Sequence, residues 1–391
     1  MQYIGAKVGI DKLAIYTPHY SLNLSLLAQA RGVAQDKFLI SLGQERMAVP
    51  PPGEDIVTMA ANAAKQVLQG INISSIEMLL FATETGIDQS KAAGIYVHDL
   101  LKLPTHCRIV ELKQACYAGT AAVQLALPFL RENPEKKVLF IAADIARYGL
   151  NTTGESSQGA GAAAAILTAS PRLLAFDPEY AIHVENVMDF WRPNYRDEAL
   201  VEGQHSSKQY LEMLETCWMR YSALSGRQFQ DHAYYCYHVP VPRLVEKAHL
   251  RLFKTEAEKQ FLLEQLQPTL SYARQIGNSY TASLFVSLAS LLDDTKIDLS
   301  QQRIGFYSYG SGCIAEYFSG IVQPGYRDSL HTPYHTHLLH ARNPLSYTEY
   351  ETLYTFSYPK DGSYLEIPVY NTGNFRLAKH HDHQRIYTSL L

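Results

Sequence analysis

L-L-F-A-T-E-T-G at residues 79–86 and A-Y-Y-C-Y-H-V-P at residues 233–240 are the two stretches that decide the fold. Each is a short apolar run with the length of a buried strand. Each ends in one ionisable side chain, Glu84 in the first stretch and His238 in the second. We therefore expect Glu84 and His238 to lie at the ends of two buried strands.

The blocks that follow these two stretches are also alike. Cys116 precedes the small-residue helix Y-A-G-T-A-A-V-Q-L-A-L, and Asn278 precedes the similar helix S-Y-T-A-S-L-F-V-S-L-A. Both helices lead to another apolar strand with a polar end, at Asp144 and at Tyr309. The repeated order of blocks indicates an ancient duplication, although chance likeness between α/β units is an alternative.

A duplication predicts two α/β halves that pack face to face, residues 1–170 and residues 171–391. Equivalent strand ends then meet in one pocket, which would hold Glu84, Cys116, His238 and Asn278. The alternation of strand-like and helix-like segments agrees with an α/β fold. We expect strands at Ile76–Thr83, Arg108–Leu112, Lys137–Ala142, Ala233–Val239 and Arg303–Tyr309, and helices at Ile56–Gln69, Tyr117–Leu130, Ser206–Leu224 and Thr281–Leu292.

Composition excludes several classes of protein. The 391 residues are 47% hydrophobic and 18% charged, which indicates much buried surface, either in a large core alone or also in a subunit interface. A net charge of -4 gives no global excess of positive charge for nucleic acid or an anionic membrane. We expect no signal peptide and no membrane span, because no apolar run is long enough. The five cysteines are odd in number and lack C-x-x-C spacing, so a reduced cytoplasm fits best.

Cys116 is the candidate nucleophile. It stands between a predicted strand and a predicted helix, where the helix N-terminus would stabilise a thiolate and lower the thiol pKa. The alternative is a core cysteine before an alanine-rich helix. Glu84 would act in proton transfer if partial burial raised its pKa, and a solvated strand end or helix cap is its alternative.

Three further groups complete the candidates from local sequence. His238 matters chiefly because it occupies the repeat position equivalent to Glu84, since a lone histidine is usually structural. Y-G-S-G, residues 309–312, permits a tight turn whose N–H groups could help to form an oxyanion hole, or it is a simple turn. Seven histidines follow residue 330, but their spacing matches no standard zinc motif, so we expect no metal site.

Many motifs, in the correct order, resemble those of the hydroxymethylglutaryl-CoA synthase family, particularly its shorter bacterial form. The resemblance runs from about Gly9 to Glu351 and fades after about residue 355. It includes K-F-L-I-S-L-G-Q-E-R-M-A-V, F-A-T-E-T, E-L-K-Q-A-C-Y-A, A-A-D-I-A-R-Y-G-L-N, D-F-W-R-P, H-V-P, G-N-S-Y-T and F-Y-S-Y-G-S-G. The family implies a thiolase-like, five-layered αβαβα fold with two pseudo-duplicated halves, usually as a homodimer.

The resemblance also assigns roles to residues of this chain. The family's nucleophile falls on Cys116, its general acid/base on Glu84 and its catalytic histidine on His238. Its substrate-binding positions fall on Asn278, Ser311, Ser206 and Tyr309, and its coenzyme A-binding positions fall on Lys37, Ser157, Arg243 and Lys247. Ser157 stands where threonine is common and Arg243 where lysine is common; arginine keeps the positive charge but changes the geometry of the coenzyme contact, and the chemistry is left intact.

The implied activity is condensation of acetyl-CoA with acetoacetyl-CoA through an acetyl-Cys116 intermediate, with no metal or redox cofactor. One alternative is a polyketide β-branching synthase that acts on a β-ketoacyl chain bound to an acyl carrier protein. R-Y-G-L-N-T-T-G-E-S-S-Q-G-A-G and D-F-W-R-P favour free coenzyme A substrates. A noncatalytic binding protein that retains the fold is the alternative of another class.

Overall fold

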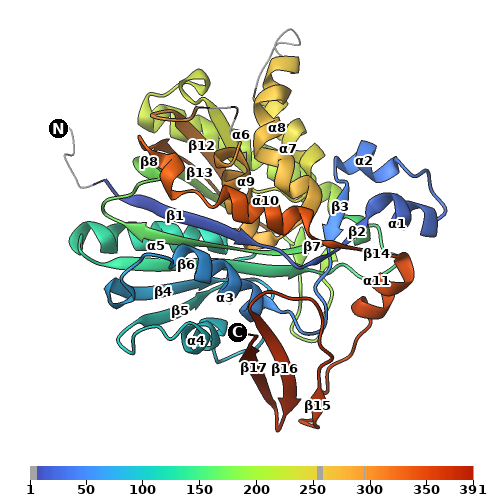
Figure 1. The fold of residues 1–391 in the computed structure, drawn as a ribbon. Helices are drawn as coiled ribbons and strands as arrows, with labels where there is room; N and C mark the ends of the chain where they lie inside the picture. Colours follow the sequence, from blue (N-terminus) through green and yellow to red (C-terminus); the bar gives the residue numbers. More distant parts are fainter. Residues whose placement is uncertain (1–6, 253–258, 295, 297, 391) are drawn as a thin grey trace.

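The protein is described from a computed structural model that places residues 7–252, 259–294, 296 and 298–390. Within this part of the chain, one nine-stranded sheet forms the centre (Figure 1). Its strands are β1 (Gly9–Tyr16), β4 (Ile76–Ala82), β5 (Arg108–Leu112), β6 (Lys137–Ala146), β7 (Gly159–Thr168), β8 (Leu174–Val184), β11 (Tyr234–Tyr237), β12 (Arg303–Gly310) and β13 (Ile314–Val322). Their order across the sheet is β11-β12-β13-β8-β1-β7-β6-β4-β5.

The strand order is alike for three strands on either side of the central pair β1 and β8, and β5 is an extra strand at one edge. Outward from β1 come β7, β6 and β4, and outward from β8 come β13, β12 and β11. In both directions the first two pairings are antiparallel and the third is parallel. The two sets of strands are joined where β1 pairs with β8, through Gly9 with Ala175 and Ile10 with Leu174. A Cβ atom at Gly9 would lie 1.9 Å from the carbonyl oxygen of Leu174, so this join requires glycine.

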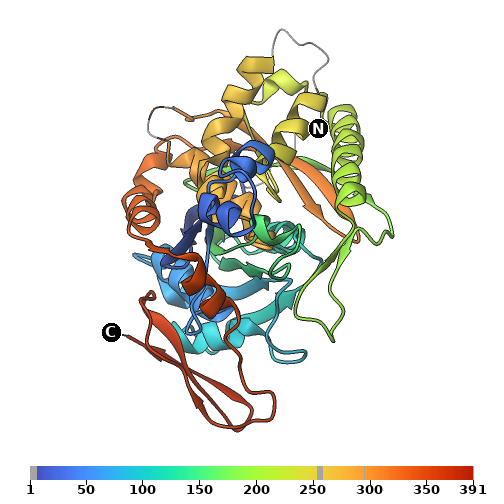
Figure 2. The same ribbon diagram turned by 90° about the vertical axis from the view of Figure 1, so that its right-hand side faces the viewer.

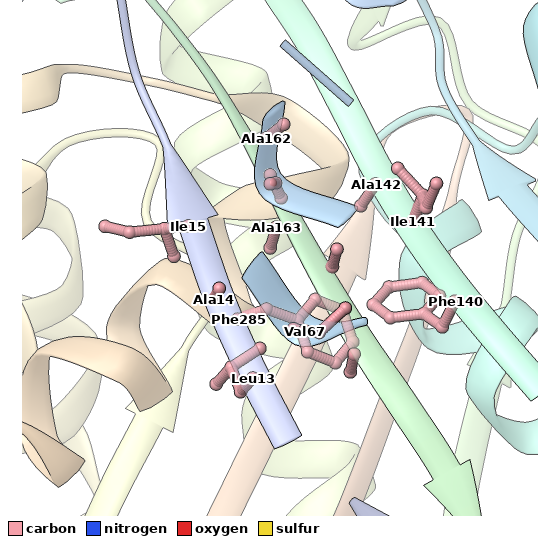
Figure 3. Packing of buried hydrophobic residues seen from close by; sticks show 14 of the residues in the cluster. Leu13, Ala14, Ile15, Val67, Phe140, Ile141, Ala142, Ala162, Ala163 and Phe285 are labelled. Atoms are coloured by element: carbon pink, nitrogen blue, oxygen red, sulfur yellow. The ribbon is translucent and has the colours of Figure 1, made fainter. Parts of the chain in front are cut away.

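Helices enclose the strands of the first half. α3 (Ile56–Val67) and α5 (Ala118–Glu132) both pack against β6 and β7, and β7 is buried along its whole length. Its run of alanines lets neighbouring side chains come close. Figure 3 shows Ala162 and Ala163 among Val67 of α3 and the larger side chains of β1 and β6.

Two helices from the second half of the chain, α9 (Ser283–Leu292) and the short 3-10 helix η5 (Tyr280–Ala282), pack against elements of the first half. α9 packs against β1, β11 and β12, and the ring centroid of its Phe285 lies 4.6 Å from that of Phe140 in β6. η5 precedes α9 and contacts α5, where the carbonyl oxygen of Thr281 lies 2.6 Å from the Cβ position of Gly119. The N-terminal end of α5 therefore adjoins η5, which leads into α9.

The other elements surround this body. α6 (Gly203–Ser225) packs against β8 and β13, and a three-stranded C-terminal sheet projects from the body (Figures 1 and 2). The remaining strands and helices are β2 (Tyr20–Asn23), α1 (Leu24–Ala30), α2 (Lys37–Leu42), β3 (Arg46–Ala48), α4 (Ala93–Leu100), β9 (Phe190–Trp191), β10 (Leu200–Val201), α7 (Pro242–Arg251), α8 (Lys259–Ile276), α10 (Thr332–His340), β14 (Asn343–Leu345), α11 (Tyr347–Tyr354), β15 (Leu365–Glu366), β16 (Phe375–His381) and β17 (Gln384–Ser389).

The five strands and four helices expected from the sequence all exist, with bounds that differ by a few residues. The helix expected at Thr281–Leu292 is divided into η5 and α9. The division into units 1–170 and 171–391 stays a prediction, since the sheet is continuous between them. Over the described residues, every helix is too short or too polar to cross a bilayer.

Candidate active site

A cavity of about 270 Å³ lies where side chains from both halves of the sheet converge. Cys116 and Tyr148 line it from the first half, and His238 and Asn278 line it from the second. Glu84 reaches this group through a hydrogen bond, because the Cys116 thiol donates to Glu84 Oε1 at 2.8 Å. The structure thus brings together the four side chains that the repeat predicted would meet.

Cys116 and Glu84 form the chemical centre of this cavity. Burial raises the pKa of Glu84 from 4.5 to about 8, and the nearby charge of Asp144 adds to the increase. Burial also raises the pKa of the Cys116 thiol well above its usual range, and the facing Glu84 carboxylate adds to this. A carboxyl group with this pKa can both accept and donate a proton near neutral pH.

The prediction of a lowered Cys116 pKa is wrong for the free protein. α5 begins at Ala118, two positions after the cysteine, and the thiol is buried beside a carboxylate. These two effects favour the neutral thiol and outweigh stabilisation of a thiolate by the helix end. By contrast, the expected increase of the Glu84 pKa is confirmed.

Asp144 ties the turn that carries Glu84 to the second half of the sheet. Its Oδ1 accepts from Thr83 Oγ1 at 2.7 Å, from the N–H groups of Glu84 and Thr85 at 2.9 Å each, and from Thr85 Oγ1 at 2.6 Å. Its Oδ2 accepts from the N–H of Thr281 at 3.0 Å and from the Thr281 hydroxyl. One fully buried carboxylate thus fixes two loops of the site relative to each other.

His238 directly follows β11 and is buried. Its Nδ1 lies 2.5 Å from the Ser283 hydroxyl, and its carbonyl oxygen accepts from Tyr210 at 2.7 Å. Burial lowers the pKa of His238 from 6.5 to about 3. The ring is therefore neutral at physiological pH and can act as a hydrogen-bonding group without carrying charge.

Asn278 and two tyrosines form the adjoining wall. The Asn278 Nδ2 group donates to Tyr148 OH at 3.4 Å, and its Oδ1 accepts from the N–H of Tyr280 at 2.9 Å. Tyr280 has a φ of 45°, which the hydrogen bond to Asn278 helps to hold. The Tyr148 and Tyr280 rings are 6.1 Å apart in an edge-to-face arrangement. This wall leaves amide and phenol groups beside Cys116.

Asp189 organises the opposite wall. Its carboxylate accepts from Ser206 Oγ at 3.0 Å, from Tyr309 OH at 2.7 Å and from the N–H of Gly312 at 2.8 Å. Ser206, Tyr309 and Ser311 all line the cavity. Two of the predicted substrate-binding hydroxyls therefore also hold the Y-G-S-G turn in place through Asp189.

The predicted coenzyme-binding residues fall into two places. Ser157 lines the cavity, whereas Lys37, Arg243 and Lys247 are exposed and outside it. Lys37 begins α2, the other two lie on α7, and Arg243 Nε donates to the carbonyl of Ile40 at 3.1 Å, so the helices adjoin. Each helix also contributes a lining residue, so the three cations are carried by helices that border the cavity.

The histidine-rich C-terminal region shows no metal-like cluster. Among the described residues, no group of three or more His, Cys, Asp and Glu side chains could hold an ion. His335 instead makes structural bonds: its Nδ1 lies 2.6 Å from Asp293 Oδ2, and its Nε2 accepts from the N–H of Ile15 at 3.0 Å.

Several residues of this site were not selected from the sequence. Asp144, Tyr148, Asp189 and Arg192 all lie inside the quoted motifs A-A-D-I-A-R-Y and D-F-W-R-P. Arg192 donates to the carbonyl oxygen of Glu84. The signal available in the sequence was a charged residue close to an apolar strand. It did not identify these residues, because the groups that such a residue contacts are remote in sequence.

Comparisons with known proteins agree on one family. The model of the hydroxymethylglutaryl-coenzyme A synthase N-terminal domain matches residues 5–172, and the model of the C-terminal domain matches residues 174–260 and 254–350. A hydroxymethylglutaryl-CoA synthase of Enterococcus faecalis is 39% identical over 89% of this chain and 91% of its own length. A polyketide biosynthesis 3-hydroxy-3-methylglutaryl-ACP synthase of Bacillus subtilis is 34% identical over 88% and 87%.

Solved structures give the same result. A crystal structure described as HMG-CoA synthase complexed with CoA matches with a TM-score of 0.94 and 37% identity, covering 98% of this chain and 100% of that one. The HMG synthase of the curacin biosynthetic pathway, in complex with a holo donor-ACP, matches with a TM-score of 0.93 and 31% identity over 98% and 100%. These matches confirm the predicted thiolase-like α/β fold class.

Proposed function

The chain belongs to the hydroxymethylglutaryl-CoA synthase family of acyl-condensing transferases, and we propose that it condenses acetyl-CoA with acetoacetyl-CoA to give 3-hydroxy-3-methylglutaryl-CoA and coenzyme A in the mevalonate route to isoprenoids. The observation that carries this proposal is the 2.8 Å contact between Cys116 Sγ and Glu84 Oε1 in a cavity shared with His238 and Asn278. Coenzyme A thioesters are the substrates, and each step balances without a metal or redox cofactor.

The first step acylates Cys116. Its sulfur attacks the thioester carbonyl of acetyl-CoA, the bond from that carbon to the coenzyme sulfur breaks, and the thiol proton leaves with coenzyme A. The N–H groups of Cys116 and Ser311 are the donors that we assign to the oxyanion. The N–H of Gly312 is already donated to Asp189.

The second step forms the carbon–carbon bond. Glu84, as carboxylate, removes a proton from the methyl group of acetyl-Cys116, and the resulting enolate attacks the ketone carbon of acetoacetyl-CoA. The protonated Glu84 then returns its proton to the new alkoxide. A neutral His238 holds the acetoacetyl group by hydrogen bonding, and Asn278, Ser206 and Tyr309 orient it.

The third step releases the product. Water attacks the Cys116 thioester, which frees 3-hydroxy-3-methylglutaryl-CoA and regenerates the thiol. Glu84 ends the cycle as a carboxylate, so it can serve again as base. Lys37, Arg243 and Lys247, on helices that border the cavity, would hold the coenzyme together with Ser157.

The direct test mixes the protein with acetyl-CoA and acetoacetyl-CoA and follows loss of the acetoacetyl-CoA enolate absorbance. We expect loss that needs both substrates and that Cys116→Ala abolishes, because no acyl-enzyme can form. Turnover that survives Cys116→Ala would contradict the mechanism. Failure to acetylate Cys116 at all would instead favour the noncatalytic alternative.

A carrier-bound acceptor is the second candidate, because two of the relatives are named for acyl-carrier-protein chemistry. Under this candidate Cys116 is acetylated, free acetoacetyl-CoA is not consumed, and acetoacetyl-carrier protein is. The higher identity to the Enterococcus faecalis enzyme supports the free coenzyme A acceptor.

We also propose that the protein is a homodimer that works in a reducing cytoplasm. Among the described strands, β5 pairs with β4 alone and forms an edge of the sheet. Val110 on β5 is 42% exposed and Leu125 on the neighbouring α5 is 64% exposed, which suits pairing with a second copy. All five cysteines are free. Light scattering after gel filtration would show a dimer, and Val110→Lys should shift it toward monomer.

A further inference from the structure

A single helix, α11, supports the loop that carries Tyr148 of the cavity wall. The loop of residues 147–158 joins β6 to β7 and places Tyr148 in the cavity. Behind it lies α11, whose Tyr347, Tyr350 and Tyr354 are spaced by three and four residues and so share one face. Successive ring centroids of these three tyrosines are 6.1 and 5.8 Å apart. We call these three residues the tyrosine stripe.

Two hydroxyls of the tyrosine stripe fix two consecutive backbone amides of the loop. Tyr354 OH accepts directly from the N–H of Gly149 at 3.0 Å. Tyr350 OH accepts from Gln158 Nε2 at 2.9 Å, and Gln158 Oε1 accepts from the N–H of Tyr148 at 2.8 Å. Gln158 thus carries the constraint from the helix to the residue that faces the cavity.

Tyr350 and Tyr347 also reach a buried carboxylate of the loop, Glu155, directly in the first case and through Arg31 in the second. Glu155 has a side chain only 2% exposed and accepts from Arg31 at 2.7 and 2.8 Å, from the N–H of Asn151 at 3.0 Å and from Tyr350 OH at 3.1 Å. Arg31 also donates to Tyr347 OH at 2.7 Å. The tyrosine stripe therefore contacts both ends of the loop, and it also contacts the Arg31–Glu155 ion pair.

The backbone turns sharply at Gly149, whose amide bonds to α11. Gly149 has a φ of 94°, which a residue with a side chain adopts only under strain. With this turn, the N–H of Gly149 bonds to α11 and the N–H of Tyr148 bonds to Gln158, while Tyr148 lines the cavity. There the phenol oxygen accepts from Asn278.

We propose that Tyr350 and Tyr354 are positioning residues, whose hydroxyls hold the 147–158 loop so that the Tyr148 phenol lies beside Asn278 and Cys116. Neither α11 residue lines the cavity, and both would act through Tyr148. The kinetic part of this inference rests on the proposed function.

The test replaces only the two hydroxyls, in Tyr350→Phe, Tyr354→Phe and the double variant. Because a displacement of about 1 Å in a reacting site can cost roughly 100-fold in rate, we expect kcat of the double variant to fall roughly 10- to 100-fold. The KM values should change less than kcat, and each single variant should lie between the double variant and the wild type. Tyr221→Phe is the matched control, since this buried tyrosine bonds to Ser319 away from the cavity.

Thermal unfolding separates positioning from simple stabilisation. A purely structural role predicts a lower Tm with an unchanged kcat per folded molecule, and that result would overturn the proposal. Crystal structures of the wild type and the double variant give a readout independent of substrate: a Tyr148 side chain in its original place would also overturn it. If the wild type were inactive, the proposed function would be refuted but this inference would not. The position of Tyr148 in the two crystal structures would then test the inference by itself.

Discussion

The two halves of the sheet place different chemistry at the same topological position. Glu84 follows β4, and His238 follows β11, the counterpart of β4 in the strand order. Both side chains are withdrawn from bulk water. Yet the pKa of Glu84 rises to about 8, whereas the pKa of His238 falls to about 3.

One physical cause produces both shifts, because burial disfavours whichever form carries charge. The carboxyl group therefore keeps its proton to higher pH, and the imidazole loses its proton at lower pH. Near neutrality the first half supplies a group that exchanges a proton, and the second half supplies a neutral hydrogen-bonding ring. A duplicated scaffold can thus divide proton transfer and substrate holding between its halves by residue choice alone.

Removing Glu84 should have the largest effect on this division of roles. Glu84→Ala should still acetylate Cys116, because the change removes a carboxylate that raises the thiol pKa. Condensation should fall by roughly 10²–10⁴-fold, the usual contribution of a general base. Mass spectrometry of the acetyl-enzyme beside steady-state turnover would show this separation. Lost acetylation with intact condensation would invert the assigned roles.

Removing His238 should have a smaller and different effect. His238→Ala should leave acetylation near the wild-type rate and raise the KM for acetoacetyl-CoA roughly tenfold, as expected for one lost hydrogen bond. Initial rates over a range of each substrate would measure this, with Tyr221→Phe as the control for a buried change elsewhere. An unchanged response to acetoacetyl-CoA would show that the second half does not hold the acceptor.

The pH profile of condensation should reflect Glu84 and not His238. Since the base is the carboxylate, kcat should rise about tenfold per pH unit below its pKa of about 8 and level off above it. His238, with a pKa of about 3, should add no inflection between pH 5 and 9. Stopped-flow rates from pH 6 to 9 would test this. A rate independent of pH below 8 would argue against Glu84 as the base.

The smallest expected effect is on stability. In the unfolded chain Glu84 ionises near 4.5, but in the fold it ionises near 8, so this group destabilises the fold increasingly as pH rises between these values. Glu84→Gln carries no charge and should raise Tm by about 2 °C at pH 8.5, with a smaller gain at pH 5. Scanning calorimetry at both pH values would show it, and a lower Tm at pH 8.5 would mean that the charged carboxylate stabilises the fold.

Much of the fold followed from local pattern, and one part did not. Apolar runs with polar ends located β4, β6, β11 and β12, because buried strands between helices need no alternation. The alanine-rich tract that forms β7 is absent from the strands expected from the sequence. Its alanines and glycines have little strand preference, and its pairing with β1 and β6 decides its structure.

Part of the candidate site could likewise be predicted from the sequence, and part could not. The repeat located Glu84, Cys116, His238 and Asn278, and the family resemblance supplied their roles, which stay predictions. The hydrogen bonds of Asp144 and Asp189 could not be predicted, because most of their partners lie on loops remote in sequence. The raised Cys116 pKa likewise depends first on burial and then on the distance to Glu84, neither of which spacing along the chain gives.

Asp144 has a consequence for assembly. Its carboxylate holds the Glu84 turn of its own half with one oxygen and the Thr281 turn of the other half with the second, so the Thr281 turn lacks this partner until the halves have docked. Recovery of activity during refolding should therefore lag behind recovery of secondary structure and report the docking step itself. A lone first half would carry both nucleophile and base yet be a poor catalyst, which ties any origin by duplication to a fused or already paired ancestor.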